Sequence, residues 1–465
     1  MAVTPQQVVD WCRGILGVDP NVAKQPLEKY LEAIPRLPAL ADLPSGTPVL
    51  VRGDVDAKPG PKVGEGDIRL RSMKDTLEFG RKKGWKQVIF GHIGRKPEGS
   101  LSKVRDRLVQ VLGCEITFIG DWWDAASLSV KPEVVQAVQA CAPGGIIMLE
   151  NSRKYDIETV LWKAKPDDLP KLADRLARYA TELSEKVAKV YVHEAFSAGS
   201  LDSSSVVAPV GMTRVALGTY EAEQFDVQLR DCLNAQLVVF SGLKADKLDD
   251  MEAMINRGKI RMVITAGSLA MALKKAAAEL DGKEFSLGVA EDPAHADKPY
   301  YIPRNRIEQA KEMVSEGRKK GMEFVMPVDF VLQDGRVSST IGPGDQQFDV
   351  GPATSELFAN TVTKFIQQHP GSIVFHNGVF GMFEDPRFEE GTRKFTSQLK
   401  RMKDAGLKVY IGGGEGGTSL EKYGQPDWVT YVFTAGGTVL NALGSEPVPY
   451  LVALKMAATG KGGQV

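Results

Sequence analysis

The chain has 465 residues, of which 43% are hydrophobic, and its 58 basic residues almost balance its 59 acidic ones. This balance gives no general attraction to nucleic acid or to an acidic membrane, so neither is expected as a partner. No apolar run approaches a membrane span, and the first residues lack the pattern of a secretion signal. The four cysteines are scattered without CxxC spacing, which favours a cytoplasmic protein with reduced thiols.

Residues 1–45 are punctuated by proline and carry apolar residues at helical spacing. Val8, Trp11, Cys12 and Leu16 would share one face of a helix. We expect a helical N-terminal extension here, and nothing in it suggests chemistry.

Strands and helices then alternate through residues 46–219. Short apolar runs predict strands at 48–52, 87–90, 115–119, 146–149 and 189–193. The helices expected between them span 68–83, 101–113, 134–140 and 169–184. Strands that alternate with helices and read as continuous apolar runs predict a parallel sheet covered on both faces.

A second alternating series fills residues 235–440, after a linker helix expected at 220–234. Its expected strands are 236–240, 262–265, 323–327, 372–375, 408–411 and 431–433, with helices at 269–280 and 306–321. Residues 441–465 are expected to pack back on the N-terminal domain. The predicted fold is α/β, with two doubly wound, Rossmann-like parallel-sheet domains of residues 46–219 and 235–440.

Residues 409–420, VYIGGGEGGTSL, combine a strand end, three glycines and a helix start. Gly412, Gly413 and Gly414 allow positive φ and a close approach of the backbone to a ligand. The free N–H groups at a helix start favour a phosphate, and the neighbouring Glu415 is suited to hold Mg²⁺ on it. The alternative reading of this stretch is a simple tight turn.

In the first half, polar residues follow the strand ends or open a helix, and most of them are cations. Together they predict a positive pocket for a small anion, because arginine forks match carboxylate and phosphate. Taken singly, each would be read as a solvated surface residue. They are Asp54, Asp56, Arg69, His92, Arg95 and Arg153.

In the second half, glycine turns recur after the strands, with a few polar residues beside them. Repeated turns at one sheet edge suit a nucleotide, so these residues predict an ATP or ADP site, although each glycine alone could be a turn residue. They are Gly242, Lys244, Lys247, Gly267, Gly351, Asn377, Glu384, Thr434, Gly436 and Gly437. An anion pocket on one domain and a nucleotide face on the other suggest phosphoryl transfer across a cleft.

Read in order, these motifs resemble phosphoglycerate kinase along nearly the whole chain. The resemblance rests on VRGDVDAKPG, GHIGRKPEGS, MLENSRKY, VHEAFSAGSLDSSS, SGLKADK, MPVDFVL, DVGPATSELF, HNGVFGMFE, IGGGEGG and FTAGGTVLNAL. It implies a hinge-closing kinase that transfers phosphate between an acyl phosphate and ADP with Mg²⁺, 3-phosphoglycerate being the default acid. It also implies that Arg69, Lys244 and Lys247 act on the transferred phosphoryl group. A monomer is expected.

The sequence departs from the family pattern mainly on the acid side. Leu201 stands where the family has an arginine, Ser200 replaces a histidine, Asp56 replaces an asparagine and His376 replaces a tryptophan. These departures leave two alternatives to the default: a related carboxylate kinase with a different acid, and an inactive nucleotide-binding homologue.

Overall fold

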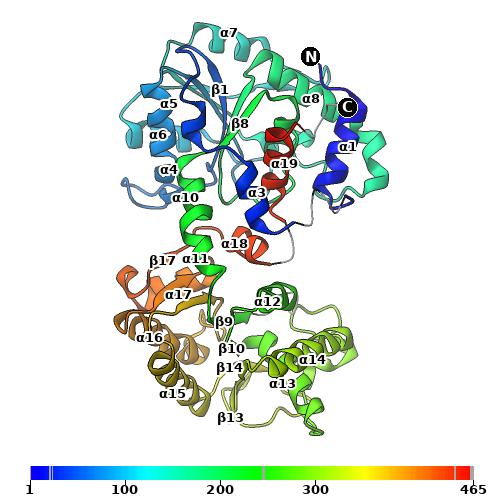
Figure 1. The fold of residues 1–465 in the computed structure, drawn as a ribbon, viewed down its shortest axis with the longest axis vertical. Helices are drawn as coiled ribbons and strands as arrows, with labels where there is room; N and C mark the ends of the chain where they lie inside the picture. Colours follow the sequence, from blue (N-terminus) through cyan, green and yellow to red (C-terminus); the bar gives the residue numbers. More distant parts are fainter. Residues whose placement is uncertain (1, 20–21, 23–24, 243–246, 445–446, 461–465) are drawn as a thin grey trace. The chain divides into compact units, whose positions relative to one another are not determined.

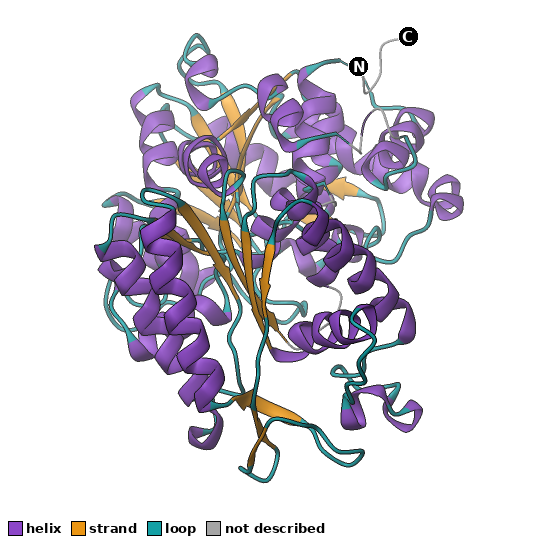
Figure 2. Ribbon diagram, turned by 60° about the horizontal axis from the view of Figure 1, so that its bottom comes forward, coloured by secondary structure: helices purple, strands orange, loops and turns teal. Residues whose placement is uncertain are grey.

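The computed structural model describes every residue except 1, 20–21, 23–24, 243–246, 445–446 and 461–465. The chain divides into two compact units, residues 1–227 with 446–465 and residues 228–445. Each unit is built around a six-stranded sheet in which all neighbouring strands run parallel (Figure 2).

The first unit has the strand order β3-β6-β2-β1-β7-β8. These strands are β1 (Pro48–Gly53), β2 (Lys86–Phe90), β3 (Ile116–Ile119), β6 (Ile146–Leu149), β7 (Val190–Glu194) and β8 (Arg214–Leu217). Between β3 and β6, the chain also forms a two-stranded antiparallel ribbon of β4 (Trp123–Asp124) and β5 (Ser129–Val130).

Helices flank this sheet (Figure 1). They are α1 (Pro5–Ile15), α3 (Leu27–Ala33), α4 (Ile68–Ser72), α5 (Lys74–Lys82), α6 (Ser102–Leu112), α7 (Pro132–Ala140), α8 (Leu169–Lys186), α9 (Ser203–Val206) and α10 (Thr219–Glu223). The C-terminal helix α19 (Pro449–Ala458) also belongs to this unit and contacts α1, α3 and α9.

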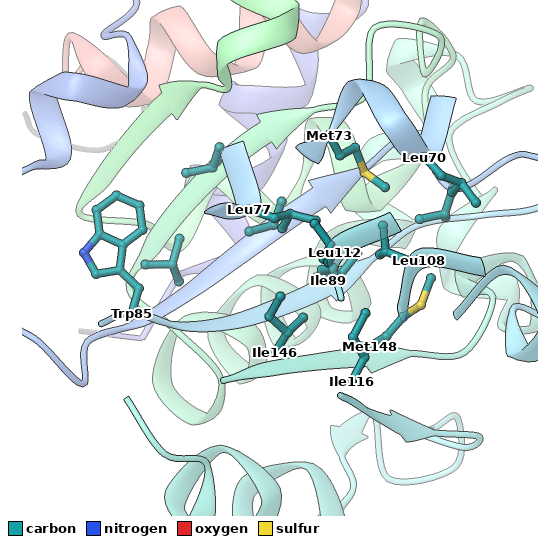
Figure 3. Close-up of a cluster of buried hydrophobic side chains, with 14 of the residues drawn as sticks. Leu70, Met73, Leu77, Trp85, Ile89, Leu108, Leu112, Ile116, Ile146 and Met148 are labelled. Carbon is teal, nitrogen blue, oxygen red and sulfur yellow. The ribbon is translucent and has the colours of Figure 1, made fainter. Parts of the chain in front are cut away.

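The core of the first unit lies where helices α4, α5 and α6 cover one sheet face (Figure 3). Leu70, Met73 and Leu77 of this helical layer pack on Ile89 and Met148 of the strands. Ile89 and Met148 come from the continuous apolar runs that predicted a covered parallel sheet.

The second unit has the strand order β11-β10-β9-β15-β16-β17. These strands are β9 (Leu237–Gly242), β10 (Met262–Ala266), β11 (Glu323–Val325), β15 (Ile373–Asn377), β16 (Lys408–Ile411) and β17 (Tyr431–Val432). The helices are α12 (Lys247–Asn256), α13 (Gly267–Leu280), α14 (Arg304–Lys319), α15 (Pro352–Gln368), α16 (Glu390–Asp404), α17 (Glu415–Tyr423) and α18 (Gly436–Leu443).

Several elements differ from the sequence-based expectation. β8 and the antiparallel sheet of β12 (Phe330–Leu332), β13 (Val337–Ser338) and β14 (Gln347–Val350) were not predicted, because strands of two to four residues show too little periodicity. The helix expected at 68–83 is divided into α4 and α5 at Met73. The expected linker helix consists of α10, a π-helical segment Gln224–Leu229 and α11 (Arg230–Cys232).

Both sheets have one strand at which the chain order changes direction. In the first sheet β1 lies between β2 and β7, and in the second β9 lies between β10 and β15. Ligands of open α/β sheets bind outside the carboxyl ends of the strands at such switch points. These two positions are therefore where a functional site is sought.

Candidate functional site

At the switch point of the first sheet, Asp54 follows β1 and Ser197 follows β7. The Ser197 hydroxyl donates to Asp54 Oδ1 at 2.7 Å, and its backbone N–H donates to Oδ2 at 3.3 Å. The Asp54 side chain is buried. Two neighbouring strand ends therefore hold this carboxylate in one orientation.

Arg69, in the first turn of α4, lies against the turn that follows β1. Its guanidinium is 3.9 Å from Asp54 Oδ1 and 3.3 Å from Asp56 Oδ2, and it donates to the Asp56 backbone carbonyl at 2.8 Å. Asp56 also accepts from the Gly94 N–H at 3.0 Å. The structure thus brings together three of the predicted residues, and the Arg69 side chain keeps 26% of its surface exposed.

Asp202, at the start of α9, is a second and fully buried centre of charge. Its Oδ2 lies 2.9 Å from His92 Nδ1, 3.0 Å from Arg153 Nη2 and 3.5 Å from Arg52 Nη2. Trp162 Nε1 donates to its Oδ1 at 2.9 Å. Two predicted residues, His92 and Arg153, therefore meet at a carboxylate of the protein itself.

These groups shift one another's protonation. Burial lowers the pKa of His92, although its hydrogen bond to Asp202 works in the opposite direction, so the imidazole is neutral near pH 7. Burial alone would raise the pKa of Asp202, but the His92 contact and the charges of Arg52 and Arg153 hold it well below its usual range. Burial, reinforced by Asp202, raises the pKa of the nearby Glu158 to about 7.

Arg95 stands apart from this cluster. It lies in the exposed loop that follows His92, and no hydrogen bond or ion pair joins its side chain to another of the described residues. Among the predicted cations of the first unit, it is the one that has no partner among the described residues.

At the switch point of the second sheet, Lys247 connects the ends of β9 and β15. Its Nζ donates to the Ser241 carbonyl and to Asn377 Oδ1, each at 3.0 Å. Burial lowers the pKa of Lys247, and the Glu415 carboxylate partly opposes this shift. Lys244 lies outside the described residues, so its place in this arrangement is not described.

Near Lys247, two glycines lie so close to neighbouring atoms that a side chain at either position would not fit. Gly242 has a φ of +154°, and a Cβ there would lie 2.8 Å from Lys247 Nζ. Gly267, with a φ of +67°, forms a backbone bridge with Gly242, and a Cβ there would lie 2.9 Å from the Gly242 carbonyl oxygen. Both turns need glycine for their φ and for the space.

A cavity of about 250 Å³ opens beside these glycines, within the second unit. Four predicted residues line it: Gly242, Gly267, Glu384 and Glu415. Much of the remaining wall is apolar and includes Met271, Leu287, Tyr300 and Phe348. A largely apolar cavity with a few polar groups at one end suits an aromatic base attached to a charged chain.

The triple-glycine turn leads from β16 into α17. A Cβ at Gly412 would lie 2.5 Å from Asn377 Nδ2, whereas Gly414, with a φ of +56°, has open space around its Cβ position. Glu415 is the first residue of α17 and is exposed. The turn therefore presents backbone and one carboxylate at a helix start, as the sequence predicted.

The remaining predicted residues lie at other helix starts of the second unit. Gly436 and Gly437 open α18, after Thr434, and a Cβ at Gly436 would lie 2.6 Å from the Gly412 carbonyl oxygen. Gly351 precedes α15, where a Cβ would overlap the Asp329 carboxylate.

Comparison with known proteins decides the family. Residues 41–446 match the family model described as phosphoglycerate kinase. The chain belongs to the phosphoglycerate kinase family. It is 30% identical over 381 residues to the phosphoglycerate kinase of Candida glabrata, an alignment that covers 78% of this chain and 84% of that one.

Two solved structures are similar in fold. The phosphoglycerate kinase of Coxiella burnetii has a TM-score of 0.66 at 21% identity, with 90% of this chain and 99% of that chain covered. The phosphoglycerate kinase of Pyrococcus horikoshii OT3 has a TM-score of 0.66 at 22% identity, with 92% and 100% covered. As a member of the phosphoglycerate kinase family, the protein is a kinase that transfers phosphate to or from a carboxylate.

Reasoning from sequence missed three residues of this phosphoglycerate kinase-like site: Asp202, Arg52 and Ser197. Each stood within a quoted motif, in GSLDSSS, VRGDVD or HEAFSAG. One signal could have led to Asp202: it directly follows Leu201, the position at which the family has an arginine. The structure is needed to identify Asp202, because its partners lie 40 to 150 positions away in the sequence.

The described residues contain no group of three or more His, Cys, Asp or Glu side chains placed to hold a metal ion. An Mg²⁺ ion carried on nucleotide phosphates takes only one or two carboxylates, because water and phosphate oxygens are its other ligands. Glu415 is suited to that role because it is exposed and lines the cavity. None of the helices in the described part of the chain has the length and apolar character needed to span a membrane.

Proposed function

We propose that the protein transfers a phosphoryl group between ATP or ADP and the carboxylate of a small acid, with 3-phosphoglycerate as the default acid. The observation that carries the proposal is that each sheet has a polar cluster at its switch point. These clusters are Asp54 with Arg69 in the first unit and Lys247 with Asn377 in the second. The name of the relatives supplies the default acid.

A carboxylate acceptor needs no general base, because it is already ionised near neutral pH. Catalysis then depends on positioning and on cations that stabilise the charge of the transferring phosphoryl group. Arg69 is assigned this role in the first unit, with Lys247 and Lys244 in the second. Asp54, Asp56, His92, Arg95 and Arg153 are assigned to the pocket around the acid.

The nucleotide is assigned to the second unit. Its base would enter the apolar part of the cavity, and its phosphates would meet the glycine turns and helix starts. Glu415 would hold Mg²⁺, which supplies charge neutralisation on the phosphates when it is bound. The residues given this role are Gly242, Gly267, Gly351, Asn377, Glu384, Gly412, Gly413, Gly414, Thr434, Gly436 and Gly437.

An assay coupled to ADP release tests the proposal, with Mg-ATP and 3-phosphoglycerate first and a panel of small carboxylic acids after it. We expect turnover that requires both Mg²⁺ and an acid. Calorimetry on the full chain should show Mg²⁺-dependent nucleotide binding. Turnover without any acid, or no nucleotide binding at millimolar concentration, would contradict the proposal.

Two alternatives give different results in the same experiments. A related kinase with another acid would turn over a member of the panel in preference to 3-phosphoglycerate. An inactive homologue would bind Mg-nucleotide and turn over no acid. We further propose that the protein works as a monomer in the cytoplasm, a location supported by four scattered cysteines that form no disulfide.

A further inference from the structure

Asp202 places a buried carboxylate among the cationic side chains of the first unit. The Asp202 side chain has no exposed surface, and the Arg52 and Arg153 side chains beside it are 1% and 7% exposed. Buried guanidinium groups need an anion or several acceptors nearby. Here the protein itself supplies that anion.

The remaining hydrogen-bonding capacity of the two arginines is mostly used. Arg52 donates through Nε to Ser205 Oγ at 3.1 Å and through Nη1 to the Gly53 carbonyl at 2.7 Å. Arg153 donates through Nη1 to the Gly94 carbonyl at 2.5 Å and through Nη2 to Ser200 Oγ at 3.3 Å. Within the described residues, Arg153 Nε is the one buried donor of the pair without an acceptor.

The charges of the arginine and aspartate side chains gathered here are nearly balanced as a result. Four guanidinium groups, those of Arg52, Arg69, Arg95 and Arg153, are matched by the carboxylates of Asp54, Asp56 and Asp202. Arg69 pairs with Asp54 and Asp56, and Arg153 and Arg52 pair with Asp202. Arg95 is the cation that remains unpaired among the described residues. Of these seven side chains, about one positive charge is left for a ligand, which matches a single carboxylate.

The surface next to Asp202 is partly apolar. Leu201 precedes it and is partly exposed. The Trp162 ring lies 4.6 Å from the Arg153 guanidinium and is 37% exposed. An uncharged tail of an acid can contact these side chains without displacing an ion pair, whereas a second anionic group would meet the Asp202 carboxylate.

We propose that Asp202 is a specificity-determining residue that occupies the place of a second ligand anion, so that the preferred acid is a monocarboxylate with an uncharged tail. The inference rests on the proposed function, because it concerns the acid of the same reaction. A phosphate at this place would either be repelled by a buried carboxylate or have to displace that carboxylate from Arg52, Arg153 and His92.

The kinetic test compares glycerate with 3-phosphoglycerate, since the two acids differ only by the phosphate. We expect the wild-type protein to have a kcat/KM for glycerate at least about tenfold above that for 3-phosphoglycerate. Asp202→Ala, and Leu201→Arg with Asp202→Ala together, should shift this ratio toward 3-phosphoglycerate by about ten- to a hundredfold. A wild-type preference for 3-phosphoglycerate that both variants reduce would overturn the inference.

A binding test gives an answer even if no acid is turned over. Inorganic phosphate should raise the melting temperature of Asp202→Ala more than that of the wild-type protein, because a free anion can then pair with Arg52 and Arg153. Asp202→Asn removes the charge with little change in size and serves if the alanine variant does not fold. No response of either variant to phosphate would overturn the inference.

Asp67→Asn is the matched control. Asp67 is also fully buried, and its Oδ2 lies 2.5 Å from Arg107 Nη1 in the same unit. Its variant should lose stability without gaining a response to phosphate. A response equal to that of the Asp202 variants would show a general effect of phosphate and overturn the inference. If phosphate stabilises the Asp202 variants as expected but no acid is phosphorylated, the result supports an anion-binding place at Asp202 and contradicts the proposed function.

Discussion

At the scale of single residues, the first unit uses arginine in two different ways. Arg52 and Arg153 are buried and paired with Asp202, whereas Arg69 is partly exposed between two carboxylates. Of these three, only Arg69 has both a fixed orientation and access to a ligand. This combination is what electrostatic stabilisation of a transferring phosphoryl group requires.

Replacing Arg69 by alanine should therefore lower kcat by roughly two to four orders of magnitude and leave KM for the nucleotide nearly unchanged. The reason is that charge spreads over the phosphoryl oxygens mainly in the transition state. Steady-state kinetics with the best acid of the panel measure the effect. Arg71→Ala is the control, because Arg71 lies on the same helix and pairs with Asp67 instead. A near-normal kcat in Arg69→Ala would show that Arg69 is a surface residue without a catalytic role.

The sequence led to Asp54, Asp56 and Arg69 because each follows a strand end or opens a helix, positions that topology brings together. It did not lead to Asp202, since nothing local distinguishes an aspartate that only starts a helix from one that also pairs with Arg52 and Arg153, far away in the sequence. The sequence predicted that His92 and Arg153 contact a ligand, whereas the structure pairs both side chains with Asp202. Their pairing is a tertiary property.

At the scale of elements, helix α13 connects the nucleotide proposal to backbone geometry. Gly267 begins this helix with a φ of +67°, and Gly282 follows its end with the same φ. Only Gly267 has a neighbour, the Gly242 carbonyl, close to the place of a Cβ. The two glycines therefore separate the cost of backbone strain from the cost of a close approach.

Gly282→Ala should lower the free energy of unfolding by about 1 kcal/mol, from backbone strain alone. Gly267→Ala should cost more and should also weaken nucleotide binding by about tenfold or more, because the Gly242 turn lines the cavity. Urea denaturation and calorimetry with Mg-ATP measure both quantities. Equal losses in the two variants, with nucleotide affinity intact, would show that the close approach has no role.

Strand β15 carries a buried imidazole at its end. His376 stacks on the Phe395 ring at 5.7 Å, and burial lowers its pKa to about 4. Between about pH 6.5 and 4 the unfolded chain therefore binds a proton that the folded chain does not. The stability that depends on the neutral ring is present above pH 6.5 and is lost as the pH falls toward 4.

His376→Phe should remove this dependence, which amounts to at most about 3 kcal/mol. Denaturant unfolding of both proteins at pH 7.5 and pH 5 gives the difference. Burial raises the pKa of Asp349 to about 7, which acts in the opposite direction, but Asp349 is present in both proteins and cancels. An unchanged loss of stability between the two pH values in the variant would contradict this account of His376.

The elements that were predicted well and those that were missed differ in how local their signals are. The strand before the glycine turn of residues 412–414 was found because apolar residues and three glycines stand together. β8 and the sheet of β12, β13 and β14 were missed because their short segments carry little pattern of their own.

At the scale of the whole molecule, each of the two parallel sheets has one switch point with polar side chains beside it. A short segment of the chain connects the two sheets. The C-terminal helix α19 belongs to the first unit, where Tyr450 stacks on His193 at 4.1 Å. The proposed function assigns the acid to the first unit and the nucleotide to the second. Neither unit alone contains all the residues assigned to the reaction.

The most direct test of the central claim is to detect the acyl phosphate itself. The full chain is incubated with Mg-ATP and each acid of the panel, and hydroxylamine traps any acyl phosphate as a hydroxamate. We predict hydroxamate that requires Mg²⁺, ATP and an acid, and that falls below detection with Arg69→Ala. Wild-type protein that binds Mg-ATP in calorimetry but forms no hydroxamate with any acid would contradict the claim that this chain is a working carboxylate kinase.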